Sequence, residues 1–226
     1  TRLRASAQTT ANLNPNWFFK GYVAYGFKDE KMKYLGQVEY SFDKKGYLPR
    51  EFPKHSVAVS YQYDNMLPSD KFINTDKDNM FTSLKWAKQT LYNYERKFTI
   101  NYEHERENGL KTSVMLRHAN YEPCGDLFYR TMADEAKLQE AIKLNPALVD
   151  EGLMHTPYNT KDITVAEATF GVRFAPGETF VNTKQRRLPI NLDAPVFSLS
   201  HTFGVSGIMG SEYTYNYTEA GFYKRL

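Results

Sequence analysis

Hydrophobic and polar residues alternate along most of the chain, and the alternation is clearest between residues 17 and 42. Phe19, Val23 and Phe27 fall in one row, and after the charged turn 28–31 the same alternation resumes. A period of two is typical of a β-strand with one apolar and one polar face. The stretch therefore predicts a β-hairpin whose apolar face needs either a packed core or a lipid bilayer.

Comparable stretches follow along the rest of the sequence. We predict strands at residues 3–13, 17–27, 34–42, 56–63, 96–103, 110–117, 161–175, 178–188, 195–205 and 213–217, of which 178–188 is unusually polar. Most are about ten residues long, the length that crosses a bilayer at a tilt. Between two of them, Asn108 and Gly109 predict a tight hairpin turn, because this pair supplies the positive φ angles that such a turn needs.

The connections between the predicted strands differ greatly in length. Those at 65–95 and 122–160 are long, whereas the turns at 107–109 and 176–177 are short. Long loops are uncommon in compact domains, and short turns on one side with long loops on the other are typical of outer-membrane barrels. The sequence predicts an all-β fold: an antiparallel transmembrane β-barrel segment of about ten strands and two long loops, with the whole chain as one partial barrel domain.

The second long loop contains a helical signal. Thr131 and Asp134 are spaced as in a capping box, and Leu138, Ala141 and Ile142 recur at helical spacing. This pattern predicts a short amphipathic helix that packs on the strand ends or, alternatively, binds a partner.

Composition narrows the possible functions. The 29 basic and 26 acidic residues leave a formal charge of only +3, which gives no electrostatic case for binding nucleic acid. Aromatic residues make up 15% of the chain, a high share that is expected in a Tyr-rich β-sandwich or in a membrane barrel with two aromatic girdles.

Cys124 is the only cysteine, so no intrachain disulfide can form. No signal peptide opens the chain, and neither end carries a stop signal, so we expect an internal piece of a longer precursor.

The polar faces carry small hydroxyl and amide residues with scattered charges, as a barrel lumen would. The candidate lumen-facing charges are Lys20, Glu39, Glu103, Lys111, Arg117, Glu167 and Arg173. A basic cluster, Lys184, Arg186 and Arg187, is a candidate contact for anionic lipopolysaccharide or for a lumenal carboxylate, and otherwise a solvated polar strand.

The sequence shows no motif of a known catalytic or cofactor site. Its five histidines lack metal-ligand spacing, and it contains neither a GxSxG elbow nor a phosphate-binding loop with its lysine. We therefore predict no catalytic, cofactor-binding or metal-binding residue.

Two segments, Leu13 to Asp29 and Ala194 to Gly204, resemble the barrel portion of large, uncharacterised outer-membrane proteins of Bacteroidetes. Those proteins carry a carboxypeptidase-regulatory-like β-sandwich before a barrel similar to surface-antigen barrels of the BamA type. The resemblance implies an outer-membrane location and no known catalytic residues. The Val-Arg-Gly-Phe motif of the BamA relatives does not occur in this sequence, so the resemblance implies no insertase activity.

These observations favour a non-enzymatic barrel segment of a bacterial outer membrane, with a role in transport, assembly or surface interaction. Its expected partners are outer-membrane lipid, with lipopolysaccharide or other envelope proteins as further possibilities, and no nucleic acid. One alternative is a soluble, secreted all-β module that binds carbohydrate or protein through loop aromatics such as Trp86, Tyr92 and Tyr158. Another is a barrel-embedded hydrolase.

Overall fold

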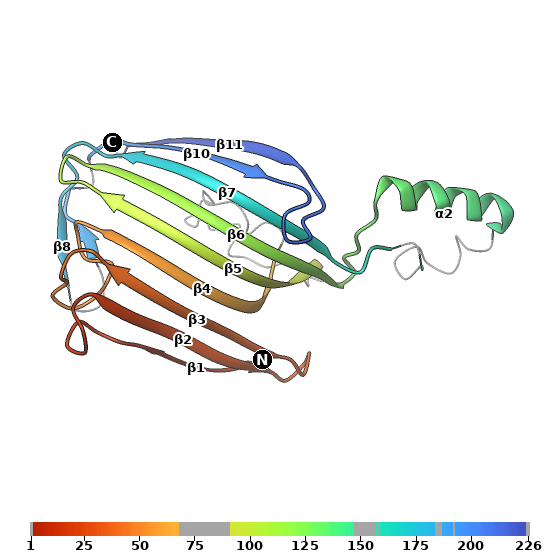
Figure 1. Cartoon of the computed structure of the whole chain (residues 1–226), viewed down its shortest axis with the longest axis horizontal. Helices are drawn as coiled ribbons and strands as arrows, with labels where there is room; N and C mark the ends of the chain where they lie inside the picture. Colours follow the sequence, from red (N-terminus) through yellow and green to blue (C-terminus); the bar gives the residue numbers. More distant parts are fainter. Residues whose placement is uncertain are drawn as a thin grey trace. The chain divides into compact units, whose positions relative to one another are not determined.

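The structure is a computed structural model that describes residues 2–67, 91–146, 157, 159–183, 187–191 and 193–224. Nine strands form one sheet, in the order β1-β2-β3-β4-β5-β6-β7-β10-β11 (Figure 1). Their bounds are β1 Arg2–Gln8, β2 Trp17–Gly26, β3 Met32–Ser41, β4 His55–Met66, β5 Leu91–Glu105, β6 Leu110–Gly125, β7 Ile163–Phe174, β10 Val196–Gly204 and β11 Tyr215–Tyr223. The strands follow one another almost in chain order, as successive hairpins do.

The predicted class, all-β and antiparallel, is confirmed. The pairs β1–β2, β2–β3, β3–β4, β7–β10 and β10–β11 are antiparallel. Within the described ranges the sheet ends at β1 on one side and at β11 on the other. These two outer strands are therefore the edges of the sheet.

Nine of the ten predicted strands lie in the main sheet. The polar stretch 178–188 is not a strand of the main sheet but forms a separate hairpin of β8 (Phe180–Asn182) and β9 (Arg187–Pro189). The sequence offers a reason, since 178–188 lacks the apolar row that the other stretches have. The predicted first strand, 3–13, was also too long, because β1 ends at Gln8.

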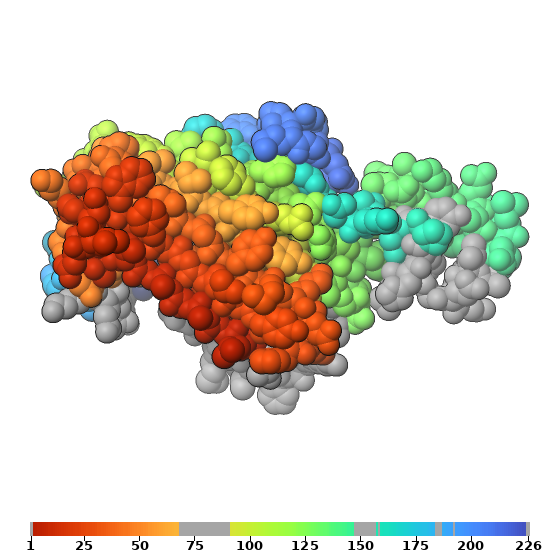
Figure 2. Space-filling view, turned by 60° about the horizontal axis from the view of Figure 1, so that its bottom comes forward, coloured from red at the N-terminus to blue at the C-terminus, as the bar shows by residue number. Residues whose placement is uncertain are grey.

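The chain divides into two compact units. The first comprises residues 1–63, 96–119 and 165–226, and the second comprises 64–95 and 120–164. The first unit contains all of β1 to β3 and β8 to β11. In the space-filling view, the atoms of β1 to β3 (red to orange) form a broad part of the surface turned to the viewer (Figure 2).

The second unit contains the predicted helix, α2 (Met132–Leu144). The Thr131 hydroxyl accepts a hydrogen bond from the backbone N–H of Asp134 at 3.1 Å and donates one to its carboxylate at 2.6 Å, so the N-cap forms as predicted. Leu138 is fully buried, and Arg130 pairs with Glu135 at 2.7 Å. In the described part of the chain, no helix has the length and apolar character to cross a membrane.

The pairing register keeps the apolar rows of neighbouring strands on one face of the sheet and the polar rows on the other. Across three strands, Val23 pairs with Tyr34 and Tyr34 with Tyr63, whereas the neighbouring position places Ala24 opposite Lys33. In the same way, Leu199 lies between Val172 and Ala220, and Ser200 lies between Gly171 and Glu219. The sheet in the first unit therefore has one mainly apolar face and one mainly polar face.

The side chains of the apolar face are exposed, and charges of the polar face are buried. Leu199 is 53% exposed and Val23 50%, whereas Glu39 and Glu167 are each only 5% exposed. Many other large apolar side chains are exposed as well, among them Phe19, Val38, Val59, Phe170, Val172, Phe197 and Phe222. Water-soluble domains normally show the reverse, because burial of such a side chain stabilises a fold by about 1.5–3 kcal/mol.

The tight turn at 106–110 forms between β5 and β6 as predicted, but with one positive φ angle instead of two. Gly109 has a φ of 83°, whereas Asn108 is not among the positive-φ residues of the described chain. Gly109 is needed for a second reason: an added Cβ would lie 2.2 Å from the carbonyl oxygen of Ala175. This close approach lets the Ala175 N–H donate to the Gly109 carbonyl at 2.9 Å, so the two turns are joined.

Candidate functional site

The polar face of the first unit carries a buried network of alternating charges. Lys54 lies in the connection 42–54, and its ammonium group contacts the carboxylates of Glu103 and Glu39, the latter at 3.4 Å. Lys111 pairs with the other oxygen of Glu103 at 2.7 Å. Alternation along β3, β5 and β6 directs Glu39, Glu103 and Lys111 to this face, and Lys54 joins them from outside the strands.

The network is electrically balanced. Two carboxylates, Glu39 and Glu103, face two ammonium groups, Lys54 and Lys111. Burial by itself lowers the pKa of Lys54, but the two carboxylates outweigh burial, and the pKa is raised above its ordinary value of 10.5. Ser56 adds a neutral hydrogen bond, donating to Glu39 at 2.8 Å. A buried charge without such partners would cost several kcal/mol.

A second ion pair joins the small hairpin to the end of β5. The guanidinium of Arg187 donates to both oxygens of Glu105, at 2.6 and 2.7 Å, and the same carboxylate accepts the backbone N–H of Lys54 at 3.1 Å. Glu105 is 5% exposed. A two-bond arginine–carboxylate contact fixes direction as well as distance, so β9 is held in one orientation against the strand end.

Aromatic and amide contacts reinforce the position of this hairpin. Arg187 lies over the Phe180 ring at 3.5 Å from its centroid, and the rings of Phe180 and Phe52 are 5.2 Å apart. Asn182 accepts from the Phe52 N–H at 3.2 Å and donates to the Phe52 carbonyl at 3.4 Å. Figure 1 shows β8 running across the strand ends at this side of the sheet. The hairpin and the connection 42–54 are thus bound together there.

Another buried pair lies further along the polar face. The Arg117 guanidinium donates to Glu167 at 2.6 Å, and the Tyr215 hydroxyl donates to the other oxygen of the same carboxylate. The Glu167 side chain is 1% exposed. The register places Tyr215 and Tyr217 on the polar face of β11, opposite Gly204 and Thr202. The tyrosine row that the sequence shows at the end of the chain is therefore part of the polar face.

The other candidates lie as follows. Lys20 is exposed on the polar face of β2, next to Gln37 in the register. Arg173 makes a two-bond pair with Glu178, at 2.6 and 2.9 Å, near the end of β7. Lys184 and Arg186 lie outside the described residues, as do Trp86 and Tyr158. Arg187, the described member of the basic cluster, pairs with the carboxylate of Glu105 in the protein itself.

Two charged residues of these ion pairs were missed by the sequence analysis. Glu105 shares the alternation of Glu103 in β5, so the period of two could have placed it on the polar face. Lys54 lies in a connection, where no periodicity exists, and no sequence signal would have found it. The sequence thus identified Glu39, Glu103 and Lys111 but neither Glu105 nor the lysine that joins two of the carboxylates.

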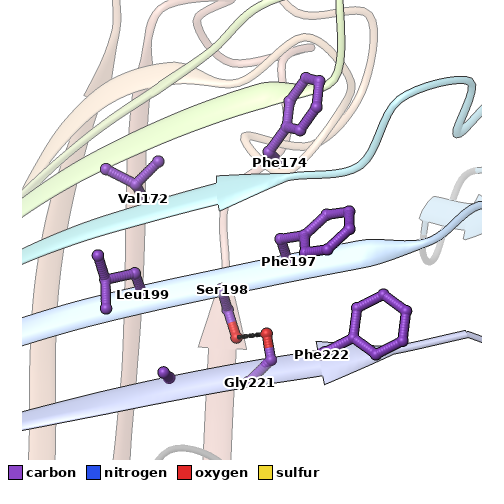
Figure 3. Close-up of a pocket in the computed structure, with 8 residues that line it drawn as sticks. Val172, Phe174, Phe197, Ser198, Leu199, Gly221 and Phe222 are labelled. Atoms are coloured by element: carbon purple, nitrogen blue, oxygen red, sulfur yellow. Dashed lines mark hydrogen bonds between the residues drawn. The ribbon is translucent and has the colours of Figure 1, made fainter.

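The opposite face carries a cluster of apolar side chains on β7, β10 and β11. Val172, Phe174, Phe197, Leu199 and Phe222 project from β7, β10 and β11 around a shallow hollow of about 400 Å³ (Figure 3). Phe197 lies between Phe174 and Phe222 in the register, and its ring centroid is 4.9 Å from that of Phe222. No charged residue lines this hollow in the part of the chain that the structure describes.

Aromatic residues gather where the apolar face of the first unit ends. Phe42 stacks on His55 with ring centroids 4.4 Å apart, and His55 stacks on His104 at 4.3 Å and bonds the Tyr102 hydroxyl at 3.2 Å. These histidines are parts of an aromatic row. Among the described residues, no group of three or more His, Cys, Asp or Glu side chains is placed to hold a metal ion.

Comparison with known proteins gives one match. The family model described as the C-terminal domain of a family of unknown function (DUF5686) matches residues 1–226. No curated protein and no solved structure matches the chain. The description of the family assigns no activity, so any function has to be argued from the geometry of the two faces.

Proposed function

Because the chain belongs to the DUF5686 family, whose function is unknown, we propose from its geometry that it is a segment of an outer-membrane β-barrel with a non-enzymatic role. In this proposal the apolar face contacts lipid and the polar face lines a lumen. The partners are then outer-membrane lipid and, at the strand ends, lipopolysaccharide or other envelope proteins. The location is a bacterial outer membrane, which the resemblance to outer-membrane proteins of Bacteroidetes also supports.

The observation that carries the proposal is the inverted burial of the two faces. Glu39, Glu105 and Glu167 are buried and paired, whereas Val23, Phe170 and Leu199 are about half exposed. A continuous exposed apolar face would be a strong aggregation liability in water. In a bilayer the same face would be covered by hydrocarbon, while the lumen of a barrel is polar.

The edges of the sheet support the same interpretation. The described sheet has β1 and β11 as outer strands, and no further described strand pairs with the outer side of either one. Exposed backbone groups are not tolerated in hydrocarbon, which is why strands cross membranes as closed barrels. In the proposed barrel these two edges pair with each other or with further strands.

The charged network favours a structured lumen. Ion pairs bridge β3, β5 and β6 on the polar face, and Arg187 holds the β8–β9 hairpin at one end of the strands. Balanced charge keeps such a surface fixed without attracting a nucleic acid or a large polyanion. Within a non-enzymatic role, this arrangement suits transport through a controlled passage, assembly or surface interaction.

Cysteine accessibility tests the proposal at two neighbouring positions of β4. In a Cys124→Ser background, Val59→Cys introduces a thiol on the apolar face and Ser60→Cys introduces one on the polar face. With the protein in lipid vesicles, we expect a membrane-impermeant maleimide to label Ser60→Cys and to leave Val59→Cys unmodified. A fluorophore attached to Val59→Cys before reconstitution should be quenched by a lipid-borne quencher.

The two positions are a matched pair, because they are adjacent in one strand and differ only in the face on which they lie. Equal labelling of both thiols from water would show that the apolar face is not covered by lipid. That result would favour the alternative of a soluble binding module, and it would overturn the membrane proposal.

A further inference from the structure

A small polar hollow of about 230 Å³ lies between the polar face of β1 to β3 and the connection 42–54. Gln8, Lys20 and Gln37 contribute to its lining from the three strands, and Arg50 contributes from the connection. Phe18 and Pro49, both buried, add an apolar wall. Ligand pockets for drug-sized molecules are typically about 300–1,000 Å³, so this hollow suits a smaller ligand.

The hollow has an excess of positive charge. Glu39 and Lys54 also line it, but both belong to the balanced network with Glu103 and Lys111. Lys20 and Arg50 have no carboxylate partner among the described residues. After the network is subtracted, two positive charges therefore remain beside one small hollow.

The neutral lining residues add hydrogen-bond donors to these charges. The side-chain amides of Gln8 and Gln37 line the same hollow, and one N–H of Gln37 already donates to Glu39 at 3.3 Å. Two cations and two amides offer more donors than the two oxygens of a carboxylate can use. A phosphate monoester has three terminal oxygens and a charge of about −1.5 to −2 at neutral pH, which matches the charge of Lys20 and Arg50.

We propose that this hollow binds a small, water-soluble phosphate monoester, with the phosphate held between Lys20 and Arg50. Arginine is suited to bidentate phosphate contacts, and lysine adds a point charge. The hollow lies on the polar face, away from the exposed apolar side chains, so a free phosphate monoester is a better fit than a lipid headgroup. The inference needs only the polar face, and it holds whether or not lipid covers the other side.

Calorimetric titration of the full chain in detergent micelles tests this proposal, with glycerol 3-phosphate as the probe. We expect saturable binding that weakens about tenfold or more in Lys20→Met and in Arg50→Met, since a hydrogen bond to a charged group contributes about 1.5–3 kcal/mol. Lys44→Met is the matched control: Lys44 is an exposed lysine of the same connection that does not line the hollow. Its affinity should equal that of the unmodified chain.

Two further arms identify the source of the phosphate and guard against misfolding. Glycerol should not bind, and short-chain phosphatidic acid added to the micelles should bind less well than glycerol 3-phosphate. Lys20→Arg keeps the charge and should keep most of the affinity, which separates loss of charge from loss of fold. Absence of glycerol 3-phosphate binding, unchanged affinity in Lys20→Met and Arg50→Met, or preference for phosphatidic acid would each overturn the proposal.

Discussion

Arg187 and Glu105 are joined by two parallel hydrogen bonds of 2.6 and 2.7 Å, although they lie 82 positions apart in the sequence. The contact holds β9 against the end of β5. It combines the strongest geometry available to an ion pair with a carboxylate that is almost fully buried. Together with the contacts of Phe180 and Asn182 with Phe52, this pair fixes the position of the small hairpin.

Removal of the arginine should destabilise the protein strongly. Arg187→Met leaves the Glu105 carboxylate buried without its main partner, and we expect the free energy of unfolding to fall by about 3 kcal/mol. Arg187→Lys keeps the charge but loses the two-bond geometry, so its effect should be smaller but still measurable. Denaturant unfolding in detergent micelles measures both values.

A double variant provides the control for this interpretation. Arg187→Met combined with Glu105→Gln removes the unpaired charge and keeps an oxygen that can accept the Lys54 N–H. We expect the double variant to be more stable than Arg187→Met alone. Glu105→Gln alone is the second single variant of this cycle. If the losses in unfolding free energy of Arg187→Met and Glu105→Gln simply add in the double variant, the two side chains do not act as a pair.

A new positive charge should destabilise the protein on the apolar face of β10 but not on its polar face. Leu199→Arg places a guanidinium on the exposed apolar face, and in lipid it should cost about 2–4 kcal/mol near the bilayer midplane. Ser200→Arg places the same group on the polar face, opposite Glu219, and should be close to neutral. Unfolding of both variants in lipid vesicles gives the comparison, and similar values for the two would contradict the lipid contact.

The faces of the strands could be predicted from sequence because the period of two is a local property. Glu167 and Arg173 were placed on the polar face, and the observed register agrees, with Phe170 and Val172 on the opposite face. A one-residue slip would have exchanged every one of these side chains between the faces. The strand pattern thus contained most of the fold of the first unit.

The contacts between charges could not be predicted in the same way. Which carboxylate Lys54 meets depends on how the connection 42–54 returns over the polar face, and no periodic signal encodes that path. Arg187 was interpreted as a contact for an external anion or a lumenal carboxylate, or else as part of a solvated polar strand, and only the folded structure shows that Glu105 lies beside it. Long-range pairs require the three-dimensional arrangement of the connections.

High pH should remove part of the stability that the network provides. Since the folded pKa of Lys54 is raised above 10.5, its contribution is complete below the unfolded pKa and is lost as the pH rises through the folded value. The difference in unfolding free energy between the unmodified chain and Lys54→Met should therefore be constant at neutral pH. It should shrink only above pH 10.5, and a decrease already at neutral pH would contradict the assignment.

Gly204 should tolerate no side chain while Tyr215 bonds Glu167. A Cβ added at Gly204 would lie 2.5 Å from the Tyr215 ring, so Gly204→Ala must displace the ring and break its hydrogen bond to the buried carboxylate. We expect a loss of about 1–3 kcal/mol in unfolding free energy, the cost of a buried polar group left unsatisfied.

The same substitution in a Tyr215→Ser background should cost much less, because no ring then occupies the space. Ser206→Ala, in the turn that follows, is a control that leaves the ring in place. If Gly204→Ala is equally costly with and without Tyr215, backbone conformation at Gly204 is the cause. Since Gly204 lies outside the positive-φ glycines of the described chain, the contact with Tyr215 is the expected cause.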